Sequence, residues 1–183
     1  MLKKNEFYQI AFLCLLTPII SLAQSHQKIR FEDIEKLNLS ASSDTVSKQI
    51  GVPSEKSASL DGGQKHQIWN YFDQTDPKVQ RASITLDIKT ERLIDKLYVP
   101  RLDEPEYKFE FVKNKKFSNS NFEKLDPSLC GKTHYEMDPF WIDTKKGIVI
   151  RVNRKTNEVA SIGWMQASEA EKFKLELLTK CSQ

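Results

Sequence analysis

Short runs in which apolar and polar residues alternate are the strongest constraint on the fold of this 183-residue chain. They occur in both halves of the sequence, at residues 67–72, 82–88, 93–99, 140–143, 147–152 and 158–165. Alternation with a period of two is typical of β-strands that bury one face. The connections at 87–92 and 153–157 are short and polar, as hairpin turns require. The pattern therefore predicts antiparallel sheet.

A short helix is expected at residues 42–50, because polar residues able to cap its start are followed by Val46 and Ile50 on one helix face. Gly51 and Pro53 then end it. Two turns of helix are too short to be stable in water by propensity alone. We therefore expect this helix to pack on the sheet.

Other segments also carry helical patterns. Residues 167–181 give the clearest one, with Ser168 as the N-cap, whereas 31–39 and 118–129 show shorter apolar repeats. Three alternating aromatic residues in the linker 101–117 favour an additional strand there: Tyr107, Phe109 and Phe111.

The two halves of the chain resemble each other in the order of their elements. ITLDIKTERLIDKLYV and IVIRVNRKTNEVASIGW both read as strand, polar turn and strand, which indicates an internal repeat of about 70 residues. Two unrelated hairpins are the alternative. We expect an α+β fold with two helix-plus-antiparallel-meander repeats packed together and a C-terminal helix. The repeats would cover residues 24–100 and 118–183, joined by 101–117.

The N-terminus has the layout of a secretory signal peptide. Within residues 1–23, Lys3 and Lys4 precede an apolar run that ends in small residues, which predicts cleavage before Gln24. The run is shorter than the roughly 20 residues of a membrane-spanning helix, so an uncleaved anchor is the alternative. We expect a periplasmic or secreted protein without a transmembrane segment after cleavage.

Cys130 and Cys181 are the cysteines that remain after such cleavage. In an exported chain, an even pair most simply forms one disulfide, with two separate buried thiols as the alternative. In the chain-entropy model this bond would contribute on the order of 4 kcal/mol and would hold the C-terminal helix to the body of the protein.

The charge and the motifs exclude several classes of function. The formal net charge is +3 for the whole chain, which gives no concentrated basic surface for nucleic acid. No nucleophile motif or phosphate-binding glycine loop is present, and no cofactor is expected. In CGKTHYEMD, alternating residues could bind zinc from one strand face: His134, Glu136 and Asp138. The same alternation describes a solvent-facing strand.

Aromatic residues of the strands are the candidates for partner binding: Trp69, Tyr71, Trp141 and Trp164. Aromatic side chains dominate protein interfaces, although strand aromatics in a small domain are also typical of the core. Tyr71 and Trp141 alternate with apolar neighbours, so we expect these two to be the most exposed.

LNLSASSDTVSKQIGVPSEK, followed by IWNYF, resembles the SmpA/OmlA family of BamE-like envelope proteins. The matching positions are Ser42, Val46, Ile50, Gly51, Pro53, Trp69 and Tyr71. Two such units in tandem are also similar to the arrangement of the β-lactamase inhibitory protein, in which helix-plus-sheet repeats present a concave sheet to a partner. The resemblance implies a binding or assembly role.

The sequence thus favours an exported, non-enzymatic protein-binding or envelope-assembly module whose partner is an envelope protein or a secreted enzyme. One alternative is a small periplasmic hydrolase or metal-binding protein centred on His134 and Glu136. A lipid or peptidoglycan binder is the other alternative.

Overall fold

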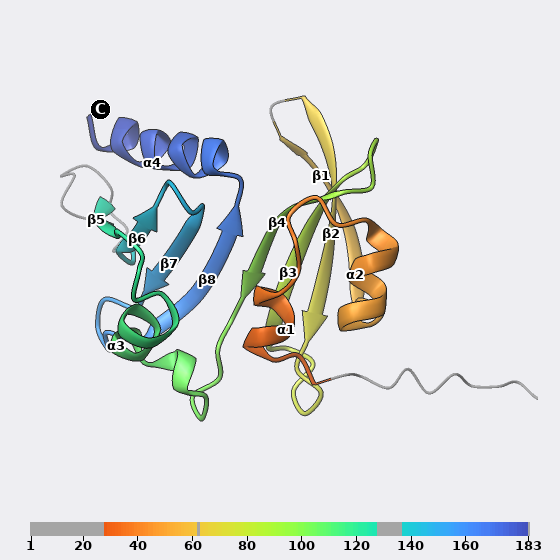
Figure 1. The fold of residues 1–183 in the computed structure, drawn as a ribbon, viewed down its shortest axis with the longest axis horizontal. Coiled ribbons are helices and arrows are strands. Elements are labelled where there is room, and N and C mark those ends of the chain that lie inside the picture. Colours follow the sequence, from red (N-terminus) through yellow and green to blue (C-terminus); the bar gives the residue numbers. More distant parts are fainter. Residues whose placement is uncertain (1–27, 62, 128–136, 183) are drawn as a thin grey trace, which may run out of the picture.

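The computed structural model describes residues 28–61, 63–127 and 137–182, and this part of the chain forms one antiparallel sheet of eight strands (Figure 1). The strands are β1 (Glu55–Asp61), β2 (Gln64–Phe72), β3 (Gln80–Asp87), β4 (Leu93–Tyr98), β5 (Glu123–Leu125), β6 (Phe140–Asp143), β7 (Ile148–Val152) and β8 (Val159–Met165). Their order is β1-β2-β3-β4-β8-β7-β6-β5, so the last strand of each half meets the other at the centre.

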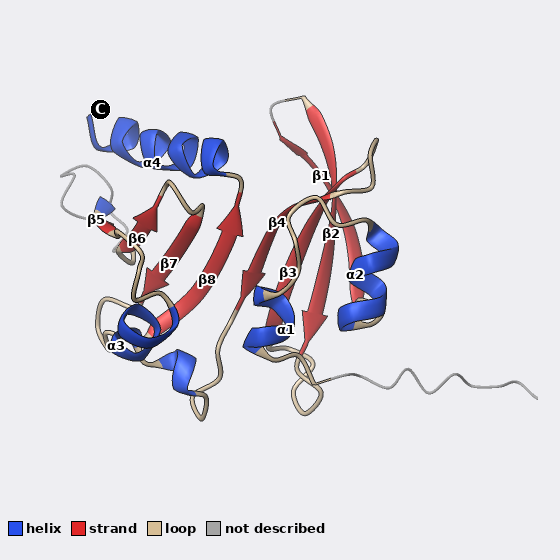
Figure 2. Cartoon of the chain, viewed as in Figure 1, coloured by secondary structure: helices blue, strands red, loops and turns tan. Residues whose placement is uncertain are grey.

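Helices cover parts of both faces of this sheet (Figure 2). They are α1 (Phe31–Glu35), α2 (Ser43–Ile50), the 3₁₀ turn η1 (Pro105–Tyr107), α3 (Phe109–Phe111), the π-helical turn η2 (Val112–Lys116) and α4 (Ala167–Ser182). The mixed helix and sheet composition, the antiparallel pairing and the C-terminal helix are as predicted.

Helix α2 begins and ends as its sequence predicts. The Ser42 side chain accepts a hydrogen bond from the backbone N–H of Thr45 (3.3 Å). Gly51 follows the last turn with φ 83° and ψ −172°, a backbone conformation that is essentially restricted to glycine. Val46 and Ile50 are both buried, and their burial holds this short helix on the sheet.

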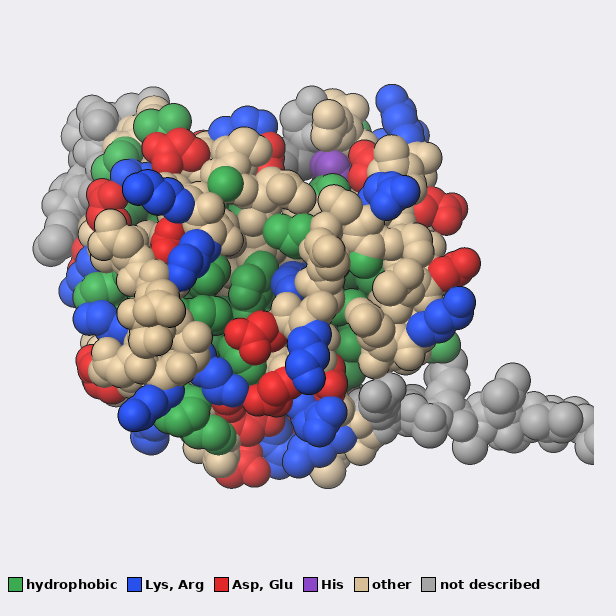
Figure 3. All heavy atoms as spheres, viewed as in Figure 1, with side chains coloured by type: hydrophobic (Ala, Val, Ile, Leu, Met, Phe, Trp, Pro, Cys, Tyr) green, Lys and Arg blue, Asp and Glu red, His purple; other side chains and the backbone are tan. Residues whose placement is uncertain are grey.

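The main core lies between the sheet and α1, α2 and α3. Its members come from both halves, and the Phe31 ring of α1 lies 5.7 Å from Trp164 of β8 and 6.2 Å from Phe117. Figure 3 shows hydrophobic side chains between the two halves on this face. The halves therefore share one core and one sheet.

A second, smaller cluster lies on the opposite face, under α4. Leu177 and Phe173 of α4 pack against strand residues of the second half, including Ile142 and Val149. On this same face of β1–β4, none of the described side chains belongs to either hydrophobic cluster. One half of the sheet is thus covered on both faces, and the other half on one.

The two central hairpins have the same pairing pattern. Ile84 pairs with Lys96 in β3–β4, and Ile150 pairs with Ile162 in β7–β8. The offset in residue number between these two pairs is the same for all the remaining pairs of the two hairpins. The register also shifts at the same step, between Thr85 and Leu86 in the first hairpin and between Arg151 and Val152 in the second. We call residues at corresponding places in these ladders matched positions.

The turns of these hairpins match as well. Asp87 Oδ1 accepts a hydrogen bond from the backbone N–H three residues later (2.7 Å), and Asn153 Oδ1 accepts the corresponding bond (3.1 Å). A residue with positive φ ends each turn, Glu91 at 53° and Asn157 at 56°. Short polar side chains that bond to their own turn explain why both segments read as hairpins in the sequence.

The resemblance to the SmpA/OmlA family, and with it the arrangement of the β-lactamase inhibitory protein, is wrong. That resemblance implies a small helix-plus-meander fold, whereas β4 pairs with β8 from Asp95 to Tyr98 and joins all eight strands into one large sheet. The short helix and aromatic strand that suggested the family are present, but they belong to a different overall architecture.

Two expected elements are also wrong. The additional strand in 101–117 is instead a series of helical turns, because Phe109 and Val112 are buried on one side of a helical path. Of the short helix expected in 118–129, the described part, residues 118–127, contains an irregular segment and the edge strand β5 instead. Strand β1 was not predicted, because only Ala58 and Leu60 alternate in its sequence EKSASLD and its other residues are polar.

The predicted disulfide falls outside the described residues. Cys130 and the side chain of Cys181 are both among those that the structure does not describe. The pairing of these cysteines, like the signal peptide in residues 1–23, stays a prediction.

Candidate functional site

Three of the four aromatic residues predicted to bind a partner lie in the core. Trp69 and Tyr71 are each 3% exposed and Trp164 is 8% exposed, whereas Trp141 is half-buried. The expectation that Tyr71 is exposed is wrong, because its side chain lies under α2 and its hydroxyl donates to the Gly51 carbonyl (3.3 Å). Burial raises the pKa of this hydroxyl. A role of these side chains in partner binding stays a prediction.

Trp69 and Trp141 occupy matched positions, since each pairs with an isoleucine of the central hairpin of its half. Each also has a lysine from the edge strand above its ring. The Lys56 ammonium lies 4.3 Å from the ring centroid of Trp69, and the Lys124 ammonium lies 6.0 Å from that of Trp141. Such contacts are attractive because a cation faces the negative face of the ring.

A cavity of about 290 Å³ lies beside Trp69. Its walls come from β1, β2, the end of β3, the β3–β4 turn and the start of α2: Ser43, Lys56, Gln67, Trp69, Leu86, Asp87, Ile88 and Glu91. The Trp69 indole N–H donates to Gln67 Oε1 (2.7 Å), and Ser43 Oγ donates to Glu91 Oε2 (3.3 Å). The cavity therefore presents one cation, two carboxylates and an amide.

The face of β1–β4 opposite α1 and α2 is the second candidate. We call it the open sheet face and define it by Ser57, His66, Ile68, Asn70, Ser83, Thr85, Asp95 and Leu97, which alternate with the core residues of their strands. Most of these side chains are half-buried. Small polar side chains thus surround two apolar ones on a surface that no described helix covers.

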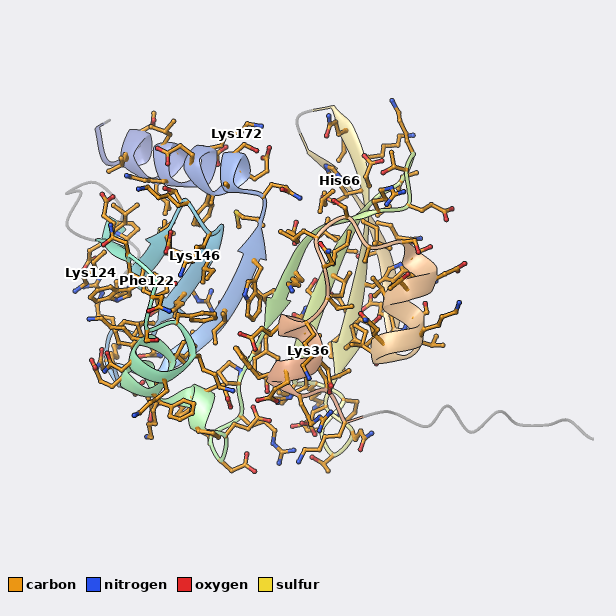
Figure 4. The ribbon with its side chains drawn as sticks, in the orientation of Figure 1. Lys36, His66, Phe122, Lys124, Lys146 and Lys172 are labelled. Carbon is orange, nitrogen blue, oxygen red and sulfur yellow. The ribbon has the colours of Figure 1, made fainter. Side chains whose placement is uncertain are left out.

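Two ionisable residues lie at this face. Burial raises the pKa of the Asp95 carboxyl, although a hydrogen bond from the Thr85 side chain acts in the opposite direction. His66 is buried, and its Nδ1 has no hydrogen-bond partner among the described residues (Figure 4). A buried nitrogen without a partner carries a desolvation cost that a bound group could relieve.

Matched positions explain why this face is open. In the second half, the residues under α4 are apolar: Leu125, Phe140, Ile142 and Val149. Their matched positions in the first half are Ser57, Ile68, Asn70 and Ser83. Three of the four are therefore polar, and the first half does not need a covering helix to stay in water.

Two buried cations have structural partners. Arg81, 3% exposed, donates to the Val99 carbonyl (2.6 Å), the Tyr98 hydroxyl (2.9 Å) and Glu104 (2.5 Å). Lys96 donates to three backbone carbonyls around the end of α1. Because this pairing satisfies both cations within the fold, neither of them indicates a ligand site.

The metal and catalytic candidates are not brought together in the part that the structure describes. His134 and Glu136 lie outside it, and Asp138 accepts a bond from the backbone N–H of Arg154 (3.2 Å) and faces Arg151 (3.7 Å). Within residues 28–61, 63–127 and 137–182, no group of three or more His, Cys, Asp or Glu side chains could hold a metal ion. Nor is any helix in these ranges long and apolar enough to cross a membrane.

No protein-family model and no curated protein sequence matches the chain. Among solved structures, it is similar to the 1.5 Å crystal structure of an extracellular protein containing a SCP domain from Bacillus anthracis str. Ames. The two chains are 15% identical with a TM-score of 0.45, and the match covers 76% of this chain and 46% of the other. This chain thus spans less than half of that protein, and the match identifies neither a family nor a function.

Proposed function

We propose that the protein is an exported, non-enzymatic binding module that holds an envelope protein or a secreted enzyme on its open sheet face. The observation that carries this proposal is the absence of any described helix over β1–β4 on that face, where α4 covers the other half. The signal-like N-terminus supports export to the periplasm or beyond.

The composition of the open sheet face fits a reversible interface. Transient interfaces are about as polar as the rest of a protein surface, and their affinity depends on a few central anchors. Ile68 and Leu97 supply apolar contacts, while Asn70, Ser83 and Thr85 supply hydrogen-bonding groups. A face of this kind remains soluble when empty and still gives a partner specific contacts.

The partner's chemistry follows from Asp95 and His66, the two ionisable residues of the open sheet face. Asp95 favours a hydrogen-bond donor or a cation, because it is desolvated with only a neutral neighbour bonded to it. His66 Nδ1 favours one further polar contact. We expect the partner to bring basic and hydroxyl side chains to this face.

We also propose that the protein consists of two helix-plus-antiparallel-meander repeats. The identical ladder register, the identical turn bonding and the matched lysine–tryptophan pairs support this. So do the isolated bridges before α2 and α3, from Ser42 to Arg92 and from Lys108 to Glu158. In this arrangement, one repeat keeps its outer face for a partner.

Site-specific photo-cross-linking tests the binding proposal. A photoreactive phenylalanine replaces Thr85 on the open sheet face or Lys48 on the exposed side of α2, and mature protein is irradiated with envelope extract of the source organism. We expect one adduct from position 85 and none from position 48. Equal labelling at both positions, or no adduct at position 85, would overturn the proposal.

Paired charge substitutions provide a second readout. Ile68→Lys and Leu97→Lys place charges on the open sheet face, whereas Val52→Lys and Leu102→Lys make the same change at exposed apolar residues elsewhere. We expect partner recovery to fall about tenfold or more in the first pair only, provided that each variant is folded by circular dichroism.

A further inference from the structure

We propose that the cavity beside Trp69 binds a small zwitterion of the free amino acid type. Its ammonium group would lie towards Glu91 and its carboxylate towards Lys56 and Gln67. This site lies on the helix-covered side of the sheet, so it is separate from the open sheet face and does not depend on partner binding.

The cavity exists because of one difference between matched positions. The first residue of α3 is Phe109, whose ring lies 4.8 Å from Trp141. The first residue of α2 is Ser43, which lies beside Trp69 and leaves the corresponding space open. The bridges before the two helices place these residues equivalently. A volume filled by an aromatic ring in one half is thus vacant in the other.

The charges around this space suit a ligand that carries both signs. Lys56 forms no ion pair with any described carboxylate, and its ammonium is held over the Trp69 ring. Glu91 is bonded to the Ser43 hydroxyl and pairs with no described basic side chain. A cation and a carboxylate that are both without an ionic partner across one cavity complement a zwitterion better than an ion of a single charge.

Gln67 orients the carboxylate end. Because its Oε1 accepts the bond from the Trp69 indole, its amide nitrogen is the group left to donate. That nitrogen and the Lys56 ammonium come from β2 and β1, whereas Glu91 comes from the β3–β4 turn. The donors and the acceptor therefore come from different elements of the fold.

The matched positions in the second half lack this chemistry. Asn157 and Asn153 replace Glu91 and Asp87, so the turn there is uncharged at these two places. The cavity volume of about 290 Å³ lies just below the usual range for small-molecule sites, and its apolar walls, Leu86 and Ile88, suit a short aliphatic side chain. The ligand would be a small amino acid rather than a peptide.

Calorimetry and ligand-observed NMR with the free amino acids test this proposal. We expect at least one small amino acid to bind the mature protein, and its methyl ester and its N-acetyl derivative, which each lack one charge, to bind at least about tenfold more weakly. If no amino acid binds at millimolar concentration, or if the ester binds as tightly as the amino acid, the proposal is overturned.

Variants that copy the second half locate the site. Ser43→Phe should abolish binding without lowering Tm, because the new ring repeats the Phe109 contact on Trp141. Glu91→Gln and Lys56→Met should each weaken binding about tenfold, while Lys124→Met, which removes the matched lysine, should leave it unchanged. Unchanged binding in folded Ser43→Phe would contradict the assignment.

Discussion

Lys96 provides a prediction whose magnitude follows from the structure. It is 4% exposed, and its ammonium donates to the carbonyls of Ile34 (2.8 Å), Glu35 (2.7 Å) and Leu37 (2.5 Å). Burial lowers its pKa from the ordinary 10.5 to about 8, against an opposing effect of the Glu35 charge. The folded protein therefore binds this proton less tightly than the unfolded chain does.

The sign of the pH effect follows from that difference. Between pH 8 and 10.5 the unfolded chain keeps the Lys96 proton and the folded protein loses it, so stability rises with pH in this window. From pH 7 to pH 9.5, the contribution of Lys96 to the free energy of unfolding should increase by about 2 kcal/mol.

Urea unfolding of wild type and Lys96→Met at pH 7 and pH 9.5 measures this effect, because the titration of all other groups cancels in the difference between the two proteins. We expect Lys96→Met to be less stable at both pH values, since it leaves carbonyls at the end of α1 without a donor. The stability difference should widen by about 2 kcal/mol at the higher pH. A difference that stays constant within about 0.5 kcal/mol would show that Lys96 keeps its ordinary pKa and would refute the reasoning.

Two further predictions concern a glycine and the two hairpin turns. Gly147 has φ 65°, and a Cβ there would lie 1.9 Å from the Met165 carbonyl oxygen, so Gly147→Ala should lower the free energy of unfolding by about 2–4 kcal/mol in the same urea assay. At Gly163 the nearest atoms to such a Cβ are 3.7 and 3.8 Å away, so Gly163→Ala should change the free energy of unfolding by less than about 1 kcal/mol. Asp87→Ala and Asn153→Ala should lower Tm by similar amounts, because both side chains bond to the same turn position; a large decrease in only one of them would contradict the equivalence of the turns.

Most of the strands could be predicted from the sequence because the sheet buries at least one face of each. Ile84 and Leu86 in β3, and Ile148 and Ile150 in β7, repeat every second residue and point into the core. Helix α2 could also be predicted from the sequence, because a capping residue, helical spacing of apolar residues and a terminating glycine occur together within about ten residues.

The errors occur where local pattern and tertiary packing differ. Phe109 and Phe111 are spaced like strand residues, yet burial of Phe109 against Trp141 selects a helical turn. Strand β1 has serines where a strand would carry apolar residues, because its face towards the open side meets water. On its other side Ala58 and Leu60 are exposed, so this edge strand buries no apolar face and its periodic signal is weak.

The candidate sites could be predicted only in part from the sequence. The aromatic residues that the sequence suggested for recognition are mostly core, since Trp69 and Tyr71 lie beneath Lys56 and α2. The residues of the open sheet face were not predicted, because half of them are small polar residues that carry no signal of their own: Ser57, Asn70, Ser83 and Thr85. Only the register of the sheet shows that they share one uncovered surface.

The binding surface and the cavity that we propose both lie where the two halves differ at matched positions. On the helix-covered side, the second half fills with Phe109 the space that the first half leaves open beside Ser43. On the opposite side, the second half covers its sheet with α4, where the first half has polar residues and no described helix. Both vacant surfaces therefore belong to the same half, and in the other half the chain's own side chains occupy the corresponding places. Both proposals therefore assign binding to the half formed by β1–β4 and α2, and they assign stabilisation of the shared sheet to β5–β8 and α4.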